Sequence, residues 1–451
     1  MKTRVYTVLS IALLLLAWQT IAWQIDKPEL IPGIPRLAGS IVRLLGTEEF
    51  YYSIGITCLR TLSGLVLSLL SAMVVAWLMA RHAWVSALFR PWLGLMRSIP
   101  VISFILIALI FIHPEGIPLL IAFLTMFPLL TENLSQAFQH FRPGYNQMAR
   151  LFHLSGYNRL TQIYYPQIKP YFFSGLSSAM GFGWRAIIMG EVLAQCTAGI
   201  GGAMKRAQLF IDIPQLLAWT GVAILLSWLS DRLIQHLAAW QPAIRFPKKE
   251  SGVQQETRLR LPVRLEGIGY HFGVRPISFE LLPNQTYALV APSGKGKTTC
   301  LRLIDGTYRP TQGTLRNCPD RISVVFQEPE LLPHLSTLDN VALPLASLFP
   351  EKEARQIAAA LLQSLEMTAF AGHVPSALSY GQQQRAALAR ALAFPAPLLL
   401  MDEPFRGLDA ELCQRIIERM KEWQRNGGQT ILFTTHQESE IKRMGAQVLP
   451  L

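Results

Sequence analysis

Charged residues are scarce in this chain. They make up 16% of its 451 residues, whereas soluble domains carry about 25%. Hydrophobic residues make up 51%, which indicates that part of the chain lies in lipid. Acidic residues are fewer than basic ones, 29 against 41, and the formal net charge is +12. The basic residues form no single patch, and many lie beside apolar runs, as in the cytosolic loops of membrane proteins. We therefore expect no nucleic-acid partner.

Cysteine is scarce as well, and the chain contains no internal repeat or low-complexity tract. No two cysteines are spaced as metal ligands or as a CxxC redox pair. An odd, scattered set fits free thiols in membrane and cytosol, so we assign these residues no function. The five are Cys58, Cys196, Cys300, Cys318 and Cys413.

The first half of the chain contains six apolar segments, although a spanning helix needs about 20 apolar residues and two segments are shorter. These two could be partly buried helices joined by residues 113–116. The first segment resembles a signal peptide, but no small-x-small cleavage site follows it, which favours an uncleaved helix. We predict an all-α transmembrane domain of about six helices over residues 1–240. The segments are 6–25, 54–79, 98–112, 117–133, 171–193 and 214–231.

Basic residues predict the orientation of these segments. They precede the first segment and follow the second, fourth and sixth, whereas the opposite loops hold fewer. Both ends of the chain should therefore face the cytosol, as a multi-pass protein of the bacterial cytoplasmic membrane. The residues on the cytosolic side are Lys2, Arg4, Arg81, Arg90, Arg97, Arg142, Arg150, Arg159, Lys169, Arg232, Arg245, Lys248 and Lys249.

Two charges, Arg185 and Glu191, lie in or near the fifth segment. A charge at that depth is costly unless it faces a partner or water. The pair could line a transport path. It could equally tie this segment to another helix, or the edge of the segment could be misplaced.

Residues 143–166 form a basic loop between the fourth and fifth segments, and most of it has the pattern of an amphipathic helix. It could dock on a soluble partner or be an ordinary loop. It resembles the coupling loop of binding-protein-dependent ABC importer permeases, whose pattern Ala149, Gly156 and Pro166 match. The acidic residue usual in that loop is missing, with Gln147 or Met148 near its place.

Further short motifs over residues 30–240 are similar to permeases of the nitrate, sulfonate and taurine type. They are MRSIP at 96–100, SGL at 174–176, Trp184 with Glu191, and GIGG at 199–202. The resemblance implies import of a small solute that a separate extracytoplasmic binding protein delivers.

Residues 241–259 are polar and read as a linker, and residues 260–451 have an α/β pattern. The stretch YALVAPSGKGKTT predicts a strand, a tight phosphate-binding loop and a helix. Ala291 occupies the place of the first glycine. Backbone N–H groups of this loop should surround phosphate oxygens, while Lys297 should reach the β- and γ-phosphates of ATP and Thr298 should bind Mg²⁺. The ATP-binding loop comprises Ala291, Pro292, Ser293, Gly294, Lys295, Gly296, Lys297, Thr298 and Thr299.

The stretch LLLMDEP predicts a buried strand that ends in Asp402 and Glu403. We expect Asp402 to hold Mg²⁺ through water and Glu403 to polarise the attacking water. The order of these motifs resembles an ABC ATPase, an α/β P-loop domain with a helical subdomain. The resemblance implies that Gln327 senses Mg²⁺, that His436 contacts the γ-phosphate and that Asp409 belongs to the D-loop. Phe272, with Tyr270 behind it, is the expected adenine-stacking ring.

The stretch LSYGQQQ resembles the ABC signature, with Tyr380 in place of its first glycine. In this family Ser379, Gly381 and Gln382 would contact ATP held by an opposite subunit. A damaged signature is the competing explanation, but we expect Tyr380→Gly to change turnover little. One P-loop, one signature and one permease half per chain predict a homodimer. The expected function is ATP-driven import with ATP and Mg²⁺, and the alternatives are an ABC exporter or a membrane-tethered ATPase that does not transport.

Overall fold

The computed structural model describes residues 2–27, 29–248, 257–270, 274–292 and 294–451. Phe272 and Ser293, both predicted ATP-site residues, lie outside the described residues. The chain forms two compact units. The first comprises Met1–Phe141 and Gln167–Gln241, and the second comprises Arg142–Pro166 and Pro242–Leu451. Residues 142–166, which we call the docking segment, therefore pack with the C-terminal part of the chain.

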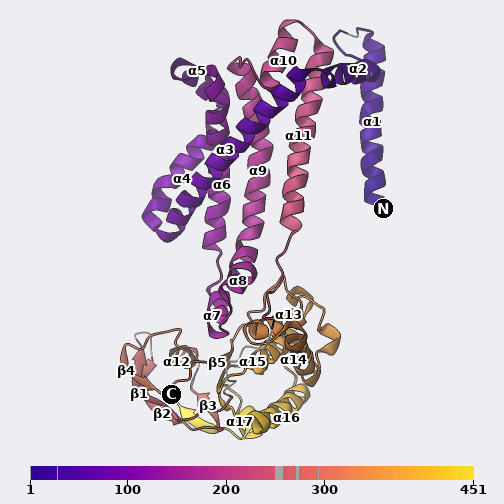
Figure 1. Ribbon diagram of the computed structural model, residues 1–451. Coiled ribbons are helices and arrows are strands. Elements are labelled where there is room, and N and C mark those ends of the chain that lie inside the picture. Colours follow the sequence, from indigo (N-terminus) through magenta and orange to yellow (C-terminus); the bar gives the residue numbers. More distant parts are fainter. Residues whose placement is uncertain (1, 28, 249–256, 271–273, 293) are drawn as a thin grey trace. The chain divides into compact units, whose positions relative to one another are not determined.

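The first unit is helical (Figure 1). Its elements are α1 (Lys2–Ile25), α2 (Ile34–Leu45), α3 (Glu48–Arg81), α4 (Ala83–Ser98), α5 (Val101–Phe111), the 3₁₀ turn η1 (Pro114–Gly116), α6 (Ile117–Gln139), α9 (Tyr165–Leu193), α10 (Ile200–Leu209) and α11 (Ile213–Ala239).

Three helical segments of the described chain are long and apolar enough to cross a membrane: α3, residues 114–139 and α11. A fourth span results if α4 and α5, which meet at 95°, count as one broken span. The bend lies at Pro100, whose missing N–H and fixed φ end the helical pattern. The prediction of about six spans stays a prediction.

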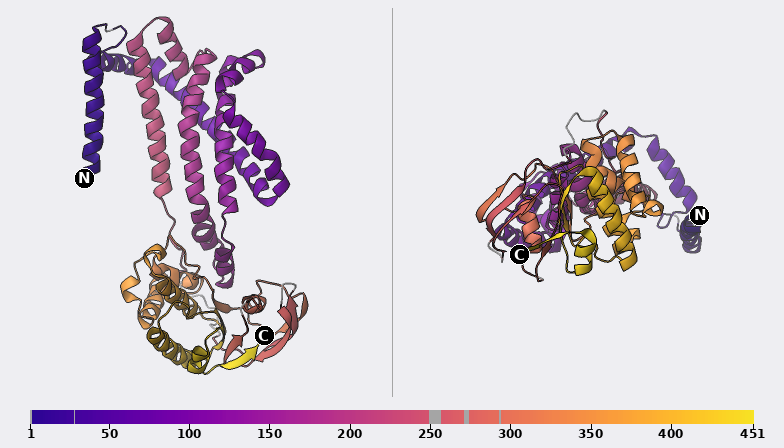
Figure 2. Two further views of the ribbon diagram at one scale, coloured as in Figure 1. Left: turned by 180° about the vertical axis from the view of Figure 1, so that it is seen from behind. Right: turned by 90° about the horizontal axis from the view of Figure 1, so that it is seen from below.

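Helices α6, α9 and α11 lie side by side (Figure 2). Gly183 of α9 faces Met126 of α6, so closely that a Cβ at this glycine would overlap the methionine. On another face of α9, the Ser177 hydroxyl donates to Asp231 of α11 at 2.5 Å, and Trp184 Nε1 donates to Ser230 at 3.1 Å. Small residues and interhelical hydrogen bonds are the contacts that hold helices together in lipid.

Glu191 is fully buried in the first unit and ties α9 to α3 and α10. Its carboxylate accepts from Arg60 Nη1 at 2.7 Å, from the Thr57 hydroxyl at 3.0 Å and from Gly201 N at 2.8 Å. Arg60 also pairs with Glu115. Of the alternatives for Glu191, this geometry favours the tie between helices. Arg185 is exposed, with its guanidinium 5.9 Å from the Phe182 ring centre.

The second unit contains a parallel sheet in the order β5-β6-β7-β3-β8 and an antiparallel sheet in the order β2-β1-β4. Strands β6 and β7 are buried throughout, as expected of a parallel sheet covered on both faces. The strands are β1 (Val263–Tyr270), β2 (Val274–Leu281), β3 (Thr286–Val290), β4 (Gln312–Arg316), β5 (Ile322–Val325), β6 (Leu398–Asp402), β7 (Thr430–Thr434) and β8 (Gln447–Pro450).

The docking segment contributes α7 (Pro143–Leu151), α8 (Gly156–Asn158) and a π-helical turn over Arg159–Tyr164. The other helices of this unit are α12 (Lys297–Ile304), α13 (Thr337–Ala342), α14 (Glu351–Ser364), α15 (Tyr380–Ala393), α16 (Ala410–Gly427) and α17 (Glu438–Met444), with 3₁₀ turns at Leu343–Ser347, Thr368–Phe370 and Pro375–Ala377. The predicted fold class, a helical N-terminal domain followed by an α/β domain with a helical subdomain, is confirmed. All five cysteines are free.

Candidate functional site

The predicted phosphate-binding loop connects β3 to α12, as the sequence pattern requires. Gly294 and Gly296 have φ angles of 79° and 92°, in the left-handed region that glycine adopts without strain. Ala291 is buried, and its carbonyl accepts from Lys297 Nζ at 2.7 Å. The alanine at the first position is therefore compatible with a closed loop.

Three ionisable side chains meet beside this loop. Lys297 Nζ lies 3.0 Å from His436 Nε2, and the same imidazole nitrogen lies 3.2 Å from Glu403 Oε1. One imidazole nitrogen can accept from the lysine or donate to the glutamate, but not both at once. The imidazole can therefore exchange partners when an anion draws Lys297 away.

Asp402 is held by hydroxyl groups on both sides. Thr298 of α12 donates to its Oδ2 at 2.7 Å, and Thr434 of β7 donates to its Oδ1 at 2.7 Å. The pairing of β6 with β7 places Asp402 opposite Thr434. The sequence therefore predicted Asp402 and Thr298 but missed Thr434, whose role depends on strand order.

Glu403 follows β6 with a φ angle of 48°. This left-handed conformation is uncommon for residues other than glycine and costs about 1–3 kcal/mol, which the surrounding structure must supply. Its N–H donates to the Thr434 hydroxyl at 3.0 Å. In this conformation, which Thr434 stabilises, the Glu403 carboxylate lies 3.2 Å from His436 Nε2.

The oxygen donors predicted for Mg²⁺ lie around one cleft. Thr298, Gln327 and Asp402 all line a cavity of about 390 Å³. Hydroxyl, amide and carboxylate oxygens are ligands that Mg²⁺ accepts, usually together with water and substrate phosphates. These three residues therefore fit the ion.

Asp305 also lines this cleft, and its burial raises the pKa of the carboxyl to about 6, above its usual range. An acid whose pKa is raised in the folded state destabilises the fold progressively as the pH rises from its ordinary pKa to the raised one, because over that range the unfolded chain ionises while the buried carboxyl does not. We expect Asp305→Asn to raise the thermal unfolding midpoint of the second unit at pH 8 and to leave it unchanged below pH 4. Asparagine keeps the oxygen that accepts from Thr307 N at 2.8 Å.

The measurement is thermal unfolding of both proteins across this pH range, by intrinsic fluorescence in detergent. Asp320→Asn, at an exposed position, is the matched control. A gain for Asp305→Asn that is largest at low pH would contradict the assignment.

The signature-like segment begins α15. The Ser379 hydroxyl accepts from Gln382 N at 3.4 Å, and Gln382 Oε1 accepts from Ser379 N at 2.9 Å, which forms a capping box. A Cβ at Gly381 would lie only 2.7 Å from the Gly407 carbonyl oxygen, so this position requires glycine. Asp409 caps α16 by accepting from Leu412 N at 2.8 Å.

Tyr380 connects this segment to the Gln327 loop of the same chain. Its hydroxyl donates to the Gln327 carbonyl at 3.2 Å, and the Arg406 guanidinium lies 5.9 Å from its ring centre. We expect Tyr380→Gly to change ATP turnover by less than about tenfold, because such a hydrogen bond contributes about 0.5–1.5 kcal/mol. Steady-state ATPase assays of Tyr380→Gly and Tyr380→Phe test this. A gain well above tenfold in Tyr380→Gly would mean that the tyrosine obstructs the site.

Of the predicted adenine-stacking residues, the structure describes Tyr270, whereas Phe272 lies outside the described residues. Tyr270 stacks on Tyr308, with ring centres 5.1 Å apart and planes inclined by 4°. Arg302 lies over the Tyr308 ring at 5.5 Å and donates to its hydroxyl at 2.9 Å. Tyr308 therefore covers one face of Tyr270, and no motif in the sequence marked it.

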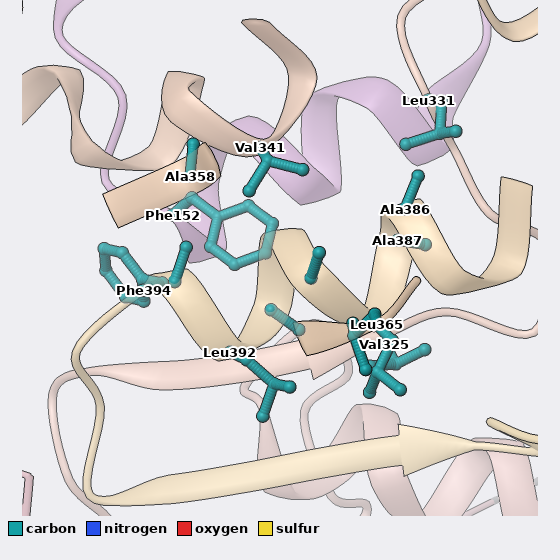
Figure 3. Packing of buried hydrophobic residues seen from close by; sticks show 14 of the residues in the cluster. Phe152, Val325, Leu331, Val341, Ala358, Leu365, Ala386, Ala387, Leu392 and Phe394 are labelled. Carbon is teal, nitrogen blue, oxygen red and sulfur yellow. The ribbon is translucent and has the colours of Figure 1, made fainter. Parts of the chain in front are cut away.

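The docking segment is buried in the core of the second unit. Met148, Ala149, Phe152 and Ile163 are at most 1% exposed and share one hydrophobic cluster with α13, α14 and α15. Figure 3 shows Phe152 beside Phe394 and over the helix that carries Ala386 and Ala387. The predicted docking of this segment on a nucleotide-binding domain is consistent with this packing. Gly156 begins α8 and Pro166 lies in the first turn of α9, where proline is tolerated.

Arg390 of α15 is fully buried beneath this segment. Its guanidinium lies 5.7 Å from the Phe152 ring centre and donates to the carbonyls of Glu330 at 2.6 Å and Pro329 at 2.8 Å. Burial lowers the pKa of Arg390 to about 10. No sequence pattern marks Arg390 for this role, because its partners are backbone carbonyls some 60 residues away.

Glu330 supplies an acidic group where the docking segment has none. Its carboxylate lies so close to Gly144 that a side chain at this glycine would overlap it. Burial raises the pKa of Glu330, and Arg390 opposes that shift. Glu330, from the Gln327 loop, thus places an acidic side chain beside residues 143–166, which contain none.

The start of the linker also packs on the docking segment. The Asn158 side chain is fully buried; it donates to the Arg245 carbonyl and accepts from Arg245 N, both at 2.9 Å. Gln162 Nε2 donates to the Pro242 carbonyl at 3.0 Å. Ile244 and Phe246 pack against the same hydrophobic cluster. Residues 242–246 are therefore held in place, whereas the sequence suggested an exposed connector.

Two family models match the chain. Residues 274–406 match the model described as ABC transporter, and residues 64–241 match the model described as binding-protein-dependent transport system inner membrane component.

Several curated import ATP-binding proteins are similar to the C-terminal part. The sulfate/thiosulfate import ATP-binding protein of Agrobacterium fabrum is 35% identical over 208 residues, which cover 42% of this chain and 60% of that protein. The spermidine/putrescine import ATP-binding protein of Roseobacter denitrificans is 37% identical over 186 residues, which cover 39% of this chain and 51% of that protein. The Fe(3+) ions import ATP-binding protein of Rhizobium etli is 35% identical over 195 residues, which cover 41% of this chain and 55% of that protein. The chain thus spans 51–60% of the length of these relatives.

Among solved structures, a dimeric bacterial ABC transporter cassette is 29% identical, with 42% of this chain and 94% of that chain covered and a TM-score of 0.39. An inward-facing metal-chelate type ABC transporter is 28% identical, with 42% of this chain and 78% of that chain covered and a TM-score of 0.37. The family assignment depends on the two family models and the curated relatives. This chain belongs to the ABC transporters, and it joins a permease domain of the binding-protein-dependent type to an ABC ATP-binding domain in one polypeptide.

Proposed function

We propose that this chain is an ATP-driven importer of a small solute in the bacterial cytoplasmic membrane. The observation that carries the proposal is the docking segment, which is continuous with α6 and α9 yet packs into the core of the ATP-binding unit. Movement within that unit would thus reach the helices of the permease. An exporter or a tethered ATPase would not need a permease domain of the binding-protein-dependent type, which residues 64–241 match.

In the proposed reaction, ATP phosphates occupy the loop 291–299. Lys297 exchanges the Ala291 carbonyl and His436 for phosphate oxygens, while backbone N–H groups at the start of α12 face the anion. Glu403 accepts a proton from the attacking water, and His436 orients the γ-phosphate. Mg²⁺, held by Thr298, Gln327 and Asp402, would neutralise charge on the phosphates.

We further propose that two copies of the chain act together. Ser379, Gly381 and Gln382 lie at the N-terminus of α15, where backbone N–H groups and the helix dipole favour an anion. In the homodimer they would contact the γ-phosphate of ATP bound to the partner, next to Asp409. Closure of the dimer would displace both docking segments and switch the permease between inward- and outward-open states.

The proposed substrate is a small solute of the nitrate, sulfonate or taurine kind, delivered by a separate extracytoplasmic binding protein. The curated relatives are named for sulfate, polyamine and iron import, so they support import without selecting one substrate. Both termini are proposed to be cytosolic.

Solute depletion tests the proposal. Cells expressing the wild type or Glu403→Gln, together with a neighbouring binding-protein gene, are grown in defined medium, and the medium is followed by mass spectrometry. We expect one solute class to be depleted by the wild type alone. A metabolite that accumulates outside would support an exporter. No change, with ATPase activity intact in the purified protein, would support the tethered ATPase.

A further inference from the structure

A second cleft lies in the ATP-binding unit, at the edge of the sheet opposite the nucleotide site. Its volume is about 590 Å³, and three chain segments line it: residues 258–261, residues 317–321 and Pro397. Pro397 precedes β6, whereas Asp402 ends that strand beside the phosphate loop. A strand of this length separates the two places by roughly 16 Å, at about 3.3 Å per residue. This cleft is therefore distinct from the ATP site.

Arginine dominates the charge of this cleft. Arg258, Arg260 and Arg321 line it together with one acidic residue, Asp320. The Arg321 Nη1 atom is buried and has no hydrogen-bond partner among the residues that the structure describes. Leaving a buried donor without a partner costs free energy, and a ligand that accepts a hydrogen bond from it would recover that cost.

The remaining walls are largely apolar. Leu259, Pro319 and Pro397 contribute to them, and Leu259 is 7% exposed. A site with guanidinium groups beside an apolar wall favours an anion that carries an apolar body over a fully hydrated inorganic ion. Guanidinium groups match phosphate oxygens in pairs of parallel hydrogen bonds.

We propose that this cleft binds a small organic phosphate, with Arg321 and Arg258 on the phosphoryl oxygens and Leu259 against the organic group. The site is placed to influence transport. His153 of the docking segment lies 3.1 Å, through Nε2, from the carbonyl of Asp320, which lines the cleft. From the same turn, β5 leads directly to the Gln327 loop. A bound phosphate would hold this turn, and through it both the docking segment and the Gln327 loop.

The test is calorimetric titration of the purified full chain in mild detergent with phenyl phosphate as the probe. ADP is kept saturating so that the nucleotide site is filled. We expect Arg321→Ala and Arg258→Ala each to weaken binding at least tenfold, and Arg321→Lys to weaken it less because the charge remains. Arg419→Ala is the matched control, since Arg419 is 64% exposed and lies 3.6 Å from Glu422 on the surface of α16. Thermal unfolding of each variant confirms that it is folded.

Three outcomes would overturn the proposal. Phenyl phosphate could fail to bind the wild type at millimolar concentrations. Binding could be lost in Lys297→Ala but retained in Arg321→Ala, which would assign it to the ATP site. Inorganic phosphate could bind as tightly as phenyl phosphate, which would remove the argument from the apolar wall.

Discussion

Glu403→Gln should bind ATP as the wild type does and hydrolyse it about 10²–10⁴ times more slowly, the usual contribution of a positioned base. The carboxylate ends a buried strand, adopts a left-handed conformation that Thr434 stabilises, and lies 3.2 Å from His436. Glutamine preserves the size and the hydrogen-bonding oxygen but cannot accept the proton of the attacking water. Phosphate release by the purified protein, measured beside nucleotide binding, checks both halves of this expectation.

Glu438→Gln is the matched control, because Glu438 is exposed at the start of α17, two residues beyond His436. Its turnover should equal that of the wild type. If Glu403→Gln retained more than about one tenth of wild-type turnover, less than the 10²-fold loss expected for a base, another group would have to activate the water.

Phe152→Ala should separate ATP hydrolysis from transport. Phe152 is fully buried between Phe394 and the Arg390 guanidinium, so its removal should weaken packing of the docking segment by about 3–5 kcal/mol. Glu403 and His436 follow β6 and β7, and Lys297 begins α12. The aromatic and cation–π contacts of Phe152 are with Phe394 and Arg390 and involve none of these three residues. We therefore expect ATPase activity within about threefold of wild type and solute uptake reduced at least tenfold, since 1.4 kcal/mol already corresponds to a factor of ten.

Leu160→Ala controls for this change, because Leu160 belongs to the same segment but is 60% exposed. It should leave uptake and hydrolysis close to wild type. Proportional loss of both activities in Phe152→Ala would indicate damage to the whole unit, and unchanged uptake would show that the docking segment does not transmit the motion.

Local patterns explain why much of the ATP site could be predicted. The phosphate loop needs glycine at particular backbone conformations, and Gly294 and Gly296 occupy them. The strand before Asp402 is an uninterrupted apolar run because helices cover the sheet on both faces. Each of these signals lies within about ten residues of sequence, the range over which turns, caps and strand patterns act.

Residues whose roles depend on distant contacts could not be predicted in this way. Arg390 binds carbonyls of the Gln327 loop, and Asn158 binds a segment 87 residues further along the chain. Glu191 stands out in the sequence as a charge in or near an apolar segment, but its partner Arg60 lies 131 residues earlier, within another apolar segment. A search for opposite charges across the predicted helices would have suggested that pair.

The central claim is that one kind of polypeptide supplies both the permease and the ATPase. The most direct test is uptake into proteoliposomes that contain only this chain, with the binding protein and the solute identified in cells added on the side opposite ATP. We predict accumulation that requires ATP and is absent with Glu403→Gln. If uptake began only after a separate permease or ATPase subunit was added, the claim would be wrong.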